Sequence, residues 1–237
     1  MAADSQGKRG KTAEASLPAT MPAKSPVKKP RAVRQRAEQQ RAVETREKII
    51  DAAEQEFASN GFEGTSTREI AKRAGVQHTM ITYHFAGKDG LWHAVFDRLS
   101  GEFVTLQRDR LEGLRGVDNK TKLRLILEEF IRYSAKNLNF HKLMTHASTE
   151  PNPRLDTIVN NYVGQYFKMV TGLIELVQKE GWFIEGEPNH LHYLFIGAST
   201  RIFMQTPEVI KVMGRSPLEK DFVDMHIEKC LELFFRD

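Results

Sequence analysis

The order of apolar and polar positions predicts helices along nearly all of the chain beyond residue 40. In residues 45–60, apolar side chains recur at Ile49, Ala53 and Phe57, the spacing of a stripe that a helix buries against a core. Strand-like alternation does not persist anywhere after residue 88. We therefore expect an all-α protein with helices over residues 45–60, 66–74, 77–85, 88–114, 118–137, 140–149, 154–179, 188–205 and 217–235.

The first three of these helices are short and separated by tight turns. Gly61 stands where a left-handed residue would end the first, and Ser66 with Glu69 forms a capping-box pattern at the start of the second. Gly75 permits a sharp turn before the third helix. This spacing predicts a helix-turn-helix, which places its last helix in a DNA major groove. The pattern alone fits an ordinary three-helix bundle without a ligand equally well.

Basic side chains around this unit favour the DNA-binding interpretation. Such residues neutralise phosphates and supply most of the sequence-independent affinity for DNA. They are Arg46, Lys48, Arg68, Lys72, Arg73 and Lys88.

The residue order here also resembles a known family. Residues 46–91 contain R-x-x-I-I-x-A-A-x-x-x-F-x-x-x-G-F, then T-S-x-R-x-I-A-x-x-A-G-V, then Y-H-F-x-x-K-x-x-L. This combination resembles the N-terminal domain of the TetR family of bacterial transcriptional regulators. The resemblance implies an N-terminal three-helix helix-turn-helix DNA-binding domain and a larger helical domain for ligand binding and dimerisation. We place their boundaries at residues 41–90 and 91–237, after a basic disordered tail over residues 1–40.

The resemblance also implies roles for individual residues. Bases would be read from the start of the third helix and from one arginine early in the second, whose guanidinium suits guanine O6 and N7. These positions correspond to Arg68, His78, Thr79 and Met80. Phosphates would be held by Arg46, Thr67, Thr82, Tyr83 and Lys88.

Two departures from the family pattern matter. Gln77 replaces the usual Ser or Thr, which weakens the cap of the reading helix by about 1 kcal/mol. Thr82 stands where Tyr is common, which puts its phosphate contact in doubt. Since His78 and Met80 are also unusual base readers, the sequence does not define the operator.

Composition agrees with a soluble protein of two domains. Hydrophobic residues make up 40% of the 237 residues, and no apolar run approaches the roughly 18 needed to span a bilayer. The N-terminal segment lacks the apolar region of a signal peptide. The lone Cys230 cannot form an internal disulfide and is expected to be a buried structural thiol. We therefore expect a cytoplasmic protein without a membrane partner.

The net charge of +4 conceals an asymmetry. Residues 1–48 hold twelve Lys and Arg against five Asp and Glu, a net +7 that leaves −3 for the other 189 residues. The first 40 residues almost lack large apolar groups and are expected to be disordered. This tail is either a solvated segment or a basic arm that adds non-specific affinity for DNA. Its inner part, residues 31–46, is compatible with an extension of the first helix.

The two C-terminal helices indicate how the chain assembles. Residues 188–205 are apolar on nearly every side, which indicates a helix buried against its own core and against a partner. Residues 217–235 carry a comparable seam. Two such helices from each subunit would form the four-helix interface of a homodimer, the arrangement that the family resemblance also implies. The residues expected in the interface are Phe195, Ile202, Ile227 and Phe234.

The helices between the DNA-binding unit and this interface are expected to enclose a cavity for a small-molecule effector. His141, His146, Asn161 and Gln165 are the polar residues best placed to orient a ligand. Each candidate is also explained as ordinary core, and no motif defines the effector. The expected lining residues are Phe103, Phe130, Leu143, His146, Tyr162, Tyr166 and Arg201.

An enzymatic function has little support in the sequence. The eight histidines include no H-x-x-x-H pair, so we expect no metal site, and no Walker, dinucleotide-binding or G-x-S-x-G motif indicates a cofactor or catalytic residue. His190 and His192 are two residues apart on a helix and would point in different directions.

We therefore predict a TetR-type regulator. It would be a repressor that binds a palindromic double-stranded operator as a dimer and is released by a small molecule. The alternatives are an activator or co-repressor-dependent regulator, and a helical interaction protein that does not bind DNA.

Overall fold

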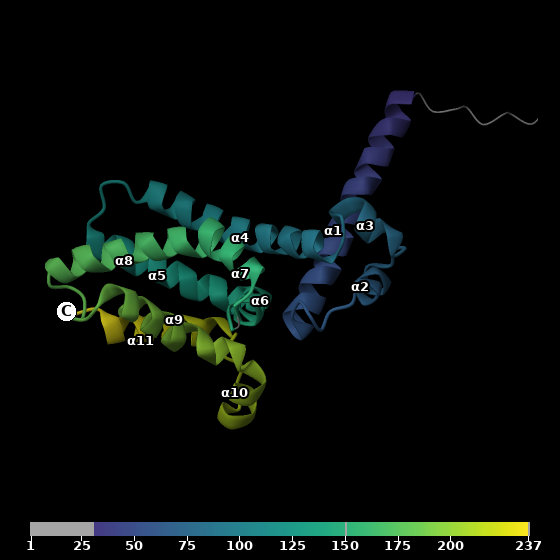
Figure 1. Ribbon diagram of the computed structural model, residues 1–237. Helices are drawn as coiled ribbons and strands as arrows, with labels where there is room; N and C mark the ends of the chain where they lie inside the picture. Colours follow the sequence, from purple (N-terminus) through teal and green to yellow (C-terminus); the bar gives the residue numbers. More distant parts are fainter. Residues whose placement is uncertain (1–30, 150, 237) are drawn as a thin grey trace, which may run out of the picture. The chain divides into compact units, whose positions relative to one another are not determined.

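The computed structural model describes residues 31–149 and 151–236, which are almost entirely helical (Figure 1). The expectation of an all-α protein is confirmed: within these ranges, backbone pairing of the β type is limited to an isolated bridge between Phe183 and Phe235. The expected basic tail lies outside the described residues as far as residue 30. The helices are α1 (Arg31–Asn60), α2 (Thr67–Ala74), α3 (Thr79–Phe85), α4 (Lys88–Gly113), α5 (Asn119–Lys136), α6 (Leu138–Ser148), α7 (Pro153–Ile158), a π-helix (Val159–Val163), α8 (Gly164–Lys179), α9 (Pro188–Met204), α10 (Thr206–Met213) and α11 (Lys220–Phe234).

The first helix begins earlier than the boundary placed after residue 40. Residues 31–40, which we assigned to the tail, form the first ten residues of α1. Their Ala, Arg, Gln and Glu side chains are strong helix formers, so the local sequence supports a helix without an apolar face. The extension of the first helix through residues 31–46 is confirmed.

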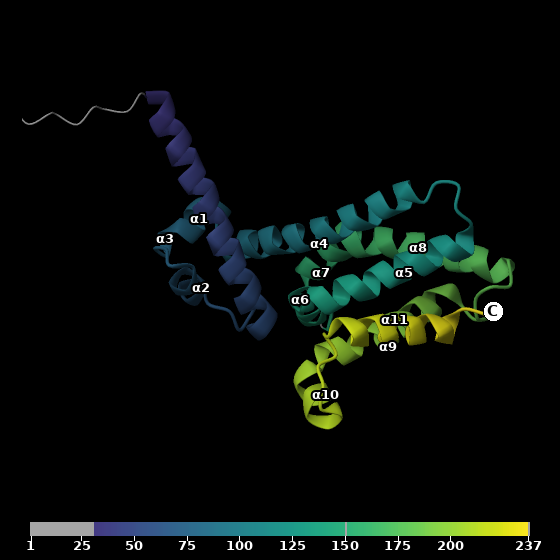
Figure 2. The same cartoon turned by 180° about the vertical axis from the view of Figure 1, so that it is seen from behind.

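Helix α5 lies at the centre of the larger domain. It packs against α4, α8, α9 and α11, and both views show these helices running alongside one another (Figures 1 and 2). It can do so because two neighbouring rows of its apolar side chains are buried: one row is Leu123, Leu127 and Ile131, and the other is Ile126, Phe130 and Tyr133. A helix that is apolar on several sides must be surrounded by other elements.

The helix predicted over residues 154–179 is interrupted by one π-helical turn. Helix α7 ends at Ile158, the π-helix occupies Val159–Val163, and α8 begins at Gly164. The Gly164 amide donates to the Val159 carbonyl, and a Cβ at this position would lie 2.9 Å from the same oxygen. Glycine therefore accommodates the wider turn, and such turns are frequent at functional sites.

The C-terminal helices differ from the prediction in one element. Helix α10 was missed because Pro207 indicated only the end of the preceding helix. In the structure Pro207 stands in the first turn of α10, where its missing amide hydrogen costs nothing. Helix α11 begins at Lys220, three residues later than predicted.

Burial keeps the thiol of the lone cysteine protonated. Cys230 is 3% exposed, and its Sγ lies 3.9 Å from the Ala198 carbonyl oxygen. Burial raises the pKa of this thiol to about 11, so little thiolate forms at neutral pH. The expected buried structural thiol is confirmed. Among the described helices, none is long and apolar enough to cross a membrane.

Candidate functional site

Helices α2 and α3 form the predicted helix-turn-helix. Ser66 caps α2 by accepting a hydrogen bond from the Arg68 amide at 3.2 Å. Gly75 ends α2 in the left-handed conformation, with φ of 67° and its amide directed at the Ala71 and Lys72 carbonyls. Both features follow the local sequence, since glycine adopts this φ without strain. We call residues 45–91, which contain this motif, the reading unit.

An ion pair inside the reading unit fixes α2 against α1. Arg73 Nε donates to Glu56 Oε1 at 2.6 Å, and Asn60 Nδ2 donates to the other oxygen of the same carboxylate at 3.0 Å. Glu56 is only 8% exposed, so this carboxylate is held by its partners rather than by water. Arg73, which the sequence grouped with the DNA-facing basic residues, therefore has a structural role instead.

The side chains expected to face DNA are mostly exposed. Arg68, Thr79, Thr82 and Tyr83 are all exposed, Tyr83 by 78%. His78 is exposed too, but its Nε2 lies 2.9 Å from Thr67 Oγ1 and so links the starts of α3 and α2.

Met80 and the cap of α3 depart from the simple expectation. Met80 is half-buried and packs against the core of the reading unit, which leaves only part of its side chain for a groove. The residue that caps α3 is His78 rather than Gln77, and its side chain makes no capping hydrogen bond. The expected weakness of this cap is thus present one residue later.

Two of the expected phosphate ligands contact aromatic rings. Lys88 is half-buried, with Nζ 4.4 Å from the centroid of the Phe62 ring. Arg46 is exposed, with Cζ 5.1 Å from the centroid of Phe85. Cation–π contacts of this kind hold a charged group near a surface while leaving its donors available.

A close approach joins the reading helix to α4. Between them, Ala86 and Gly87 adopt positive φ angles of 57° and 119°. Gly90 then packs so tightly that a Cβ there would lie 1.8 Å from the Phe85 carbonyl oxygen. The position of α3 is therefore coupled directly to the first turn of α4.

A cavity of about 470 Å³ lies within the larger domain. Its wall comes from α4, α5, α6, α7, the π-helix, α8 and α9. The volume falls in the usual range for small-molecule sites, about 300–1,000 Å³. Aromatic rings dominate the wall: Phe96, Phe103, Phe130, Phe140, Tyr162 and Tyr166.

Four polar atoms of the cavity wall are buried without a hydrogen-bond partner in the described part of the chain. Ser100 and His192 are 2% and 5% exposed. Burial lowers the pKa of His141 and of His192 to about 4, so both rings are neutral at pH 7, and burial raises the pKa of the Tyr166 hydroxyl. The atoms are Ser100 Oγ, His141 Nε2, Tyr166 Oη and His192 Nδ1.

The structure brings together only part of the predicted lining. Phe103, Phe130, Tyr162 and Tyr166 line the cavity, as does His141. Three residues of the predicted set and two of the predicted polar residues do not: they are Leu143, His146, Arg201, Asn161 and Gln165.

The three residues of the predicted lining that lie outside the cavity do so for different physical reasons. Leu143 is 2% exposed and belongs to the core. His146 is exposed, and its ring lies against Gly61. Arg201 is exposed on α9 and donates to Gln205 at 3.0 Å.

Sequence reasoning missed Ser100 and His192 as cavity residues. His192 is buried while His190 is exposed, which agrees with the expected divergence of the two rings. The buried side of α9 could have indicated His192 through its spacing with Phe195 and Ser199. No local signal identifies Ser100.

Arg154 of α7 connects the cavity wall to the reading unit. Its Cζ lies 3.6 Å from the centroid of the Phe62 ring, and its nitrogens lie 3.1 Å from Glu63 and 3.5 Å from Asp89. The next residue, Leu155, lines the cavity. Helix α7 therefore touches the cavity, the loop that contains Phe62 and Glu63, and the first turn of α4.

A second connection runs through α4. Arg98 pairs with Asp51 at 2.6 Å and Glu54 at 2.5 Å on α1, and Asn139 of α6 donates to Glu54 at 3.0 Å. The pKa of Arg98 is lowered by burial, but the hydrogen bonds and charges of these carboxylates outweigh that effect and raise it overall. This network ties α1, α4 and α6 together beside the cavity.

Comparison with known proteins identifies the family. The sequence model described as "Bacterial regulatory proteins, tetR family" matches residues 49–95. Those residues contain α2, α3 and their turn, the geometry described above. The chain belongs to the TetR family.

Individual relatives of the TetR family align well beyond the reading unit. The chain is 25% identical over 188 residues to the probable HTH-type transcriptional regulator YttP of Bacillus subtilis, covering 79% of this chain and 90% of YttP. It is 26% identical over 200 residues to the HTH-type transcriptional regulator RutR of Escherichia coli, covering 83% and 92%. The crystal structure of HlyIIR, a hemolysin II transcriptional regulator, superposes with a TM-score of 0.61 at 25% identity, covering 79% and 97%. The protein is a TetR-type transcriptional regulator; members of this family bind DNA and act as dimers.

The residues expected in the TetR-type dimer interface are mostly core of their own chain. Phe195, Ile227 and Phe234 are at most 5% exposed, and the rings of Phe195 and Phe234 lie 5.5 Å apart. Ile202 is half-buried. Phe195, Ile227 and Phe234 therefore leave little surface for a partner, because apolar side chains on two faces of a helix indicate burial but not which face belongs to a partner.

The outward faces of α9 and α11 carry a different apolar set. Leu194 is 48% exposed and Leu233 is 65% exposed, and α9 also exposes the small residues Gly197 and Ala198. The two helices are in contact, since His226 Nε2 lies 3.0 Å from the Ser199 carbonyl oxygen. We call this set the α9–α11 face.

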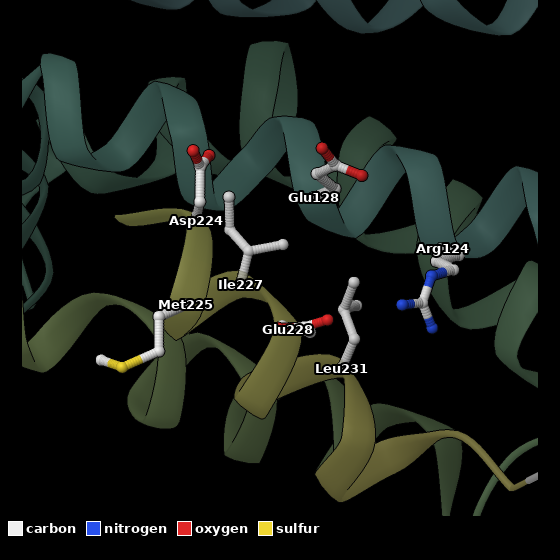
Figure 3. Close-up of a pocket in the computed structure, with 7 residues that line it drawn as sticks. All are labelled: Arg124, Glu128, Asp224, Met225, Ile227, Glu228 and Leu231. Atoms are coloured by element: carbon white, nitrogen blue, oxygen red, sulfur yellow. The ribbon is translucent and has the colours of Figure 1, made fainter. Parts of the chain in front are cut away.

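A shallow groove of about 380 Å³ lies between α5 and α11 (Figure 3). Figure 3 shows Arg124 and Glu128 of α5 opposite Asp224 and Glu228 of α11. The Lys220 ammonium, 2.8 Å from Asp224, lowers the pKa of its carboxyl group together with Arg132, which pairs with it at 2.5 Å. The charged wall distinguishes this groove from the apolar cavity.

Proposed function

We propose that this TetR-family protein is a dimeric repressor that reads an inverted repeat and leaves DNA when a small molecule fills the cavity. The observation that carries the proposal is that α4 and α7 line the cavity and also contact the reading unit. Helix α4 begins at Lys88, directly after the turn that follows α3, and Arg154 of α7 contacts Phe62, Glu63 and Asp89.

The exposed side chains of the reading unit suit the roles that the family pattern implies. Arg68, His78 and Thr79 are proposed to read bases, with Met80 adding an apolar edge. Phosphate contacts are proposed for the exposed hydroxyls of Thr82 and Tyr83, for the half-buried hydroxyl of Thr67, and for the cations held over aromatic rings. These residues are Arg46, Thr67, Thr82, Tyr83 and Lys88.

Dimerisation is part of this proposal because a single seven-residue reading helix offers little contact area. A two-fold dimer presents two such helices about one DNA turn apart, which matches an inverted repeat. The α9–α11 face supports this assembly, since its exposed leucines would leave water and its small residues allow close helix packing.

Release follows from coupling between the cavity and the reading unit. A ligand that moves α4 and α7 shifts the separation of the two reading helices in the dimer. If the ligand favours the non-binding separation by about 2.7 kcal/mol, operator affinity falls about 100-fold.

Fluorescence anisotropy with the DNA that flanks the protein's own gene tests this proposal. We expect salt-dependent binding to an inverted repeat. Arg68→Ala and His78→Ala should change the preference among operator variants, whereas Tyr83→Ala and Lys88→Ala should weaken binding to all of them similarly. Absence of salt-dependent binding would refute DNA recognition. A ligand that strengthens operator binding would refute release and indicate a co-repressor.

A further inference from the structure

The chemistry of the cavity wall defines the class of molecule that fits inside. Of the residues that line the cavity, none is Asp, Glu, Lys or Arg. The two lining histidines are held neutral by burial. A charged ligand would leave water without a counter-charge, which costs several kcal/mol per ion.

Charged side chains near the wall are directed elsewhere. Arg154 contacts Phe62 and pairs with Glu63 and Asp89, outside the cavity. Asp97 is exposed and accepts a hydrogen bond from the Tyr162 hydroxyl. Neither charge is therefore available to neutralise a ligand group among the aromatic rings.

The unpartnered polar atoms lie around two neighbouring rings. Phe130 and Tyr166 stack with centroids 5.9 Å apart, His141 lies 5.9 Å from Phe130, and His192 lies 6.0 Å from Tyr166. Ser100 adds a hydroxyl from α4. These groups come from four helices, and the rings of Phe130 and Tyr166 connect three of them, His141, Tyr166 and His192.

Their hydrogen-bonding capacity points to an oxygen acceptor on the ligand. The Ser100 and Tyr166 hydroxyls each carry one hydrogen to donate, and the Tyr166 hydroxyl stays protonated because burial raises its pKa. Each neutral imidazole supplies one further donor or acceptor. A buried polar atom without a partner costs about 1–3 kcal/mol, so a ligand that satisfies these atoms gains affinity from them.

The volume limits the size of the ligand. At about 30 Å³ for each water-sized group, a cavity of 470 Å³ holds on the order of 15 such groups. The aromatic wall favours flat, apolar parts that pack face or edge against rings.

We propose that the effector is a neutral, largely apolar molecule of about 15–20 non-hydrogen atoms that carries a carbonyl or similar acceptor oxygen at one end. That oxygen meets the Ser100 and Tyr166 hydroxyls, and free carboxylates, phosphates and cations are rejected. This inference rests on the proposed function only in calling the occupant an effector, since the chemistry of the cavity stands by itself.

Three probes of equal size test the inference on the full chain without DNA. They are 4-acetylbiphenyl, a neutral ketone; biphenyl-4-carboxylate, its anionic counterpart; and 4-isopropylbiphenyl, which lacks oxygen. Calorimetry and thermal unfolding at pH 7.5 should show the ketone binding at least about tenfold more tightly than either other probe, because each satisfied buried partner is worth about 1–3 kcal/mol.

Variants locate the oxygen contact. Tyr166→Phe and Ser100→Ala should each lower ketone affinity several-fold and leave 4-isopropylbiphenyl binding unchanged. Tyr133→Phe is the matched control, because the Tyr133 hydroxyl donates to the Leu99 carbonyl at 3.0 Å and does not line the cavity.

The outcomes separate this inference from the proposed function. Equal or tighter binding of the carboxylate, or binding of none of the three probes, overturns the inference about ligand class. Operator release measured with whichever probe binds reports on the proposed function alone. A ketone that binds through Tyr166 but leaves operator affinity unchanged supports the inference and contradicts ligand-induced release.

Discussion

Replacing Arg154 by methionine should weaken the communication between the cavity and the reading unit. Arg154 is the charged residue of α7 whose side chain reaches the Phe62 ring and two acidic residues of the reading unit, Glu63 and Asp89. Methionine keeps an apolar stem of similar length but loses the charge and the planar guanidinium.

The expected magnitude follows from the exposure of each partner. The Arg154 side chain is 20% exposed, whereas Glu63 and Asp89 are 85% and 72% exposed. Exposed partners make each ion pair worth only about 0.2–1 kcal/mol. The stacking on Phe62 is largely shielded from water and contributes about 1–2 kcal/mol. We therefore expect a loss of about 1–3 kcal/mol, most of it from the stacking contact.

Operator affinity measured with and without 4-acetylbiphenyl shows whether this energy contributes to coupling. In the wild-type protein the ligand should lower operator affinity, and in Arg154→Met the ratio of operator affinity without ligand to that with ligand should be at least about fivefold smaller. Arg154→Lys should behave nearly as Arg154→Met, because a lysine keeps the charge but not the flat stacking surface. Arg108→Met is the control, since Arg108 lies on α4 and its ion pair within the described residues is with exposed Asp109 at 3.5 Å.

A single result would refute this reasoning. If Arg154→Met lost stability but kept the full ligand-dependent change in operator affinity, α7 would support the fold without transmitting ligand binding. Coupling would then have to pass through α4 and the Arg98 network alone.

Three further predictions concern the connection between α3 and α4, the dimer interface and the cavity. Gly90→Ala should lower operator affinity more than tenfold while the dimer persists. Gly101→Ala is its control and should leave operator binding intact, because a Cβ there meets open space. Equal effects of the two variants would contradict the close approach between Gly90 and the end of α3. Leu194→Glu should yield folded monomers by sedimentation, and a stable dimer would place the interface away from the α9–α11 face. Since burial holds the pKa of His141 and of His192 near 4, the unfolded chain binds more protons between about pH 4 and 6.5. The free energy of unfolding should therefore be highest above pH 6.5 and fall as pH drops toward 4, by up to about 3 kcal/mol per histidine. Replacing both histidines by Phe should flatten this pH dependence when the free energy of unfolding is measured by denaturant titration.

The helical architecture was largely predictable because its signals are local. The stripe of Ile49, Ala53 and Phe57, the Ser66 cap and the Gly75 turn each act within a few residues, and the structure shows each of them where the sequence predicts it. Helix α10 was missed because Pro207 both ends one helix and suits the first turn of the next. The π-helical turn was missed because one extra residue per turn leaves no clear change in apolar spacing.

The candidate sites divide in the same way. The DNA-facing residues could be proposed from the sequence because they belong to one short motif with a fixed internal geometry. The structure added that Arg73 is held by Glu56 and that Met80 is half-buried, since both facts depend on packing against α1 or the core. The cavity was predicted only in part, because its wall is assembled from helices far apart in the sequence.

By itself, the sequence determined the helices, the helix-turn-helix and the family pattern, because capping, turns and apolar periodicity act between near neighbours along the chain. Only the tertiary structure decided which apolar face of α9 is core and which is exposed, because both faces read alike in sequence. It also decided that Ser100 and His192 line the cavity and each carry a buried polar atom without a partner, and that Arg154 touches the reading unit. Those facts depend on which distant segments meet, and local periodicity carries no information about that.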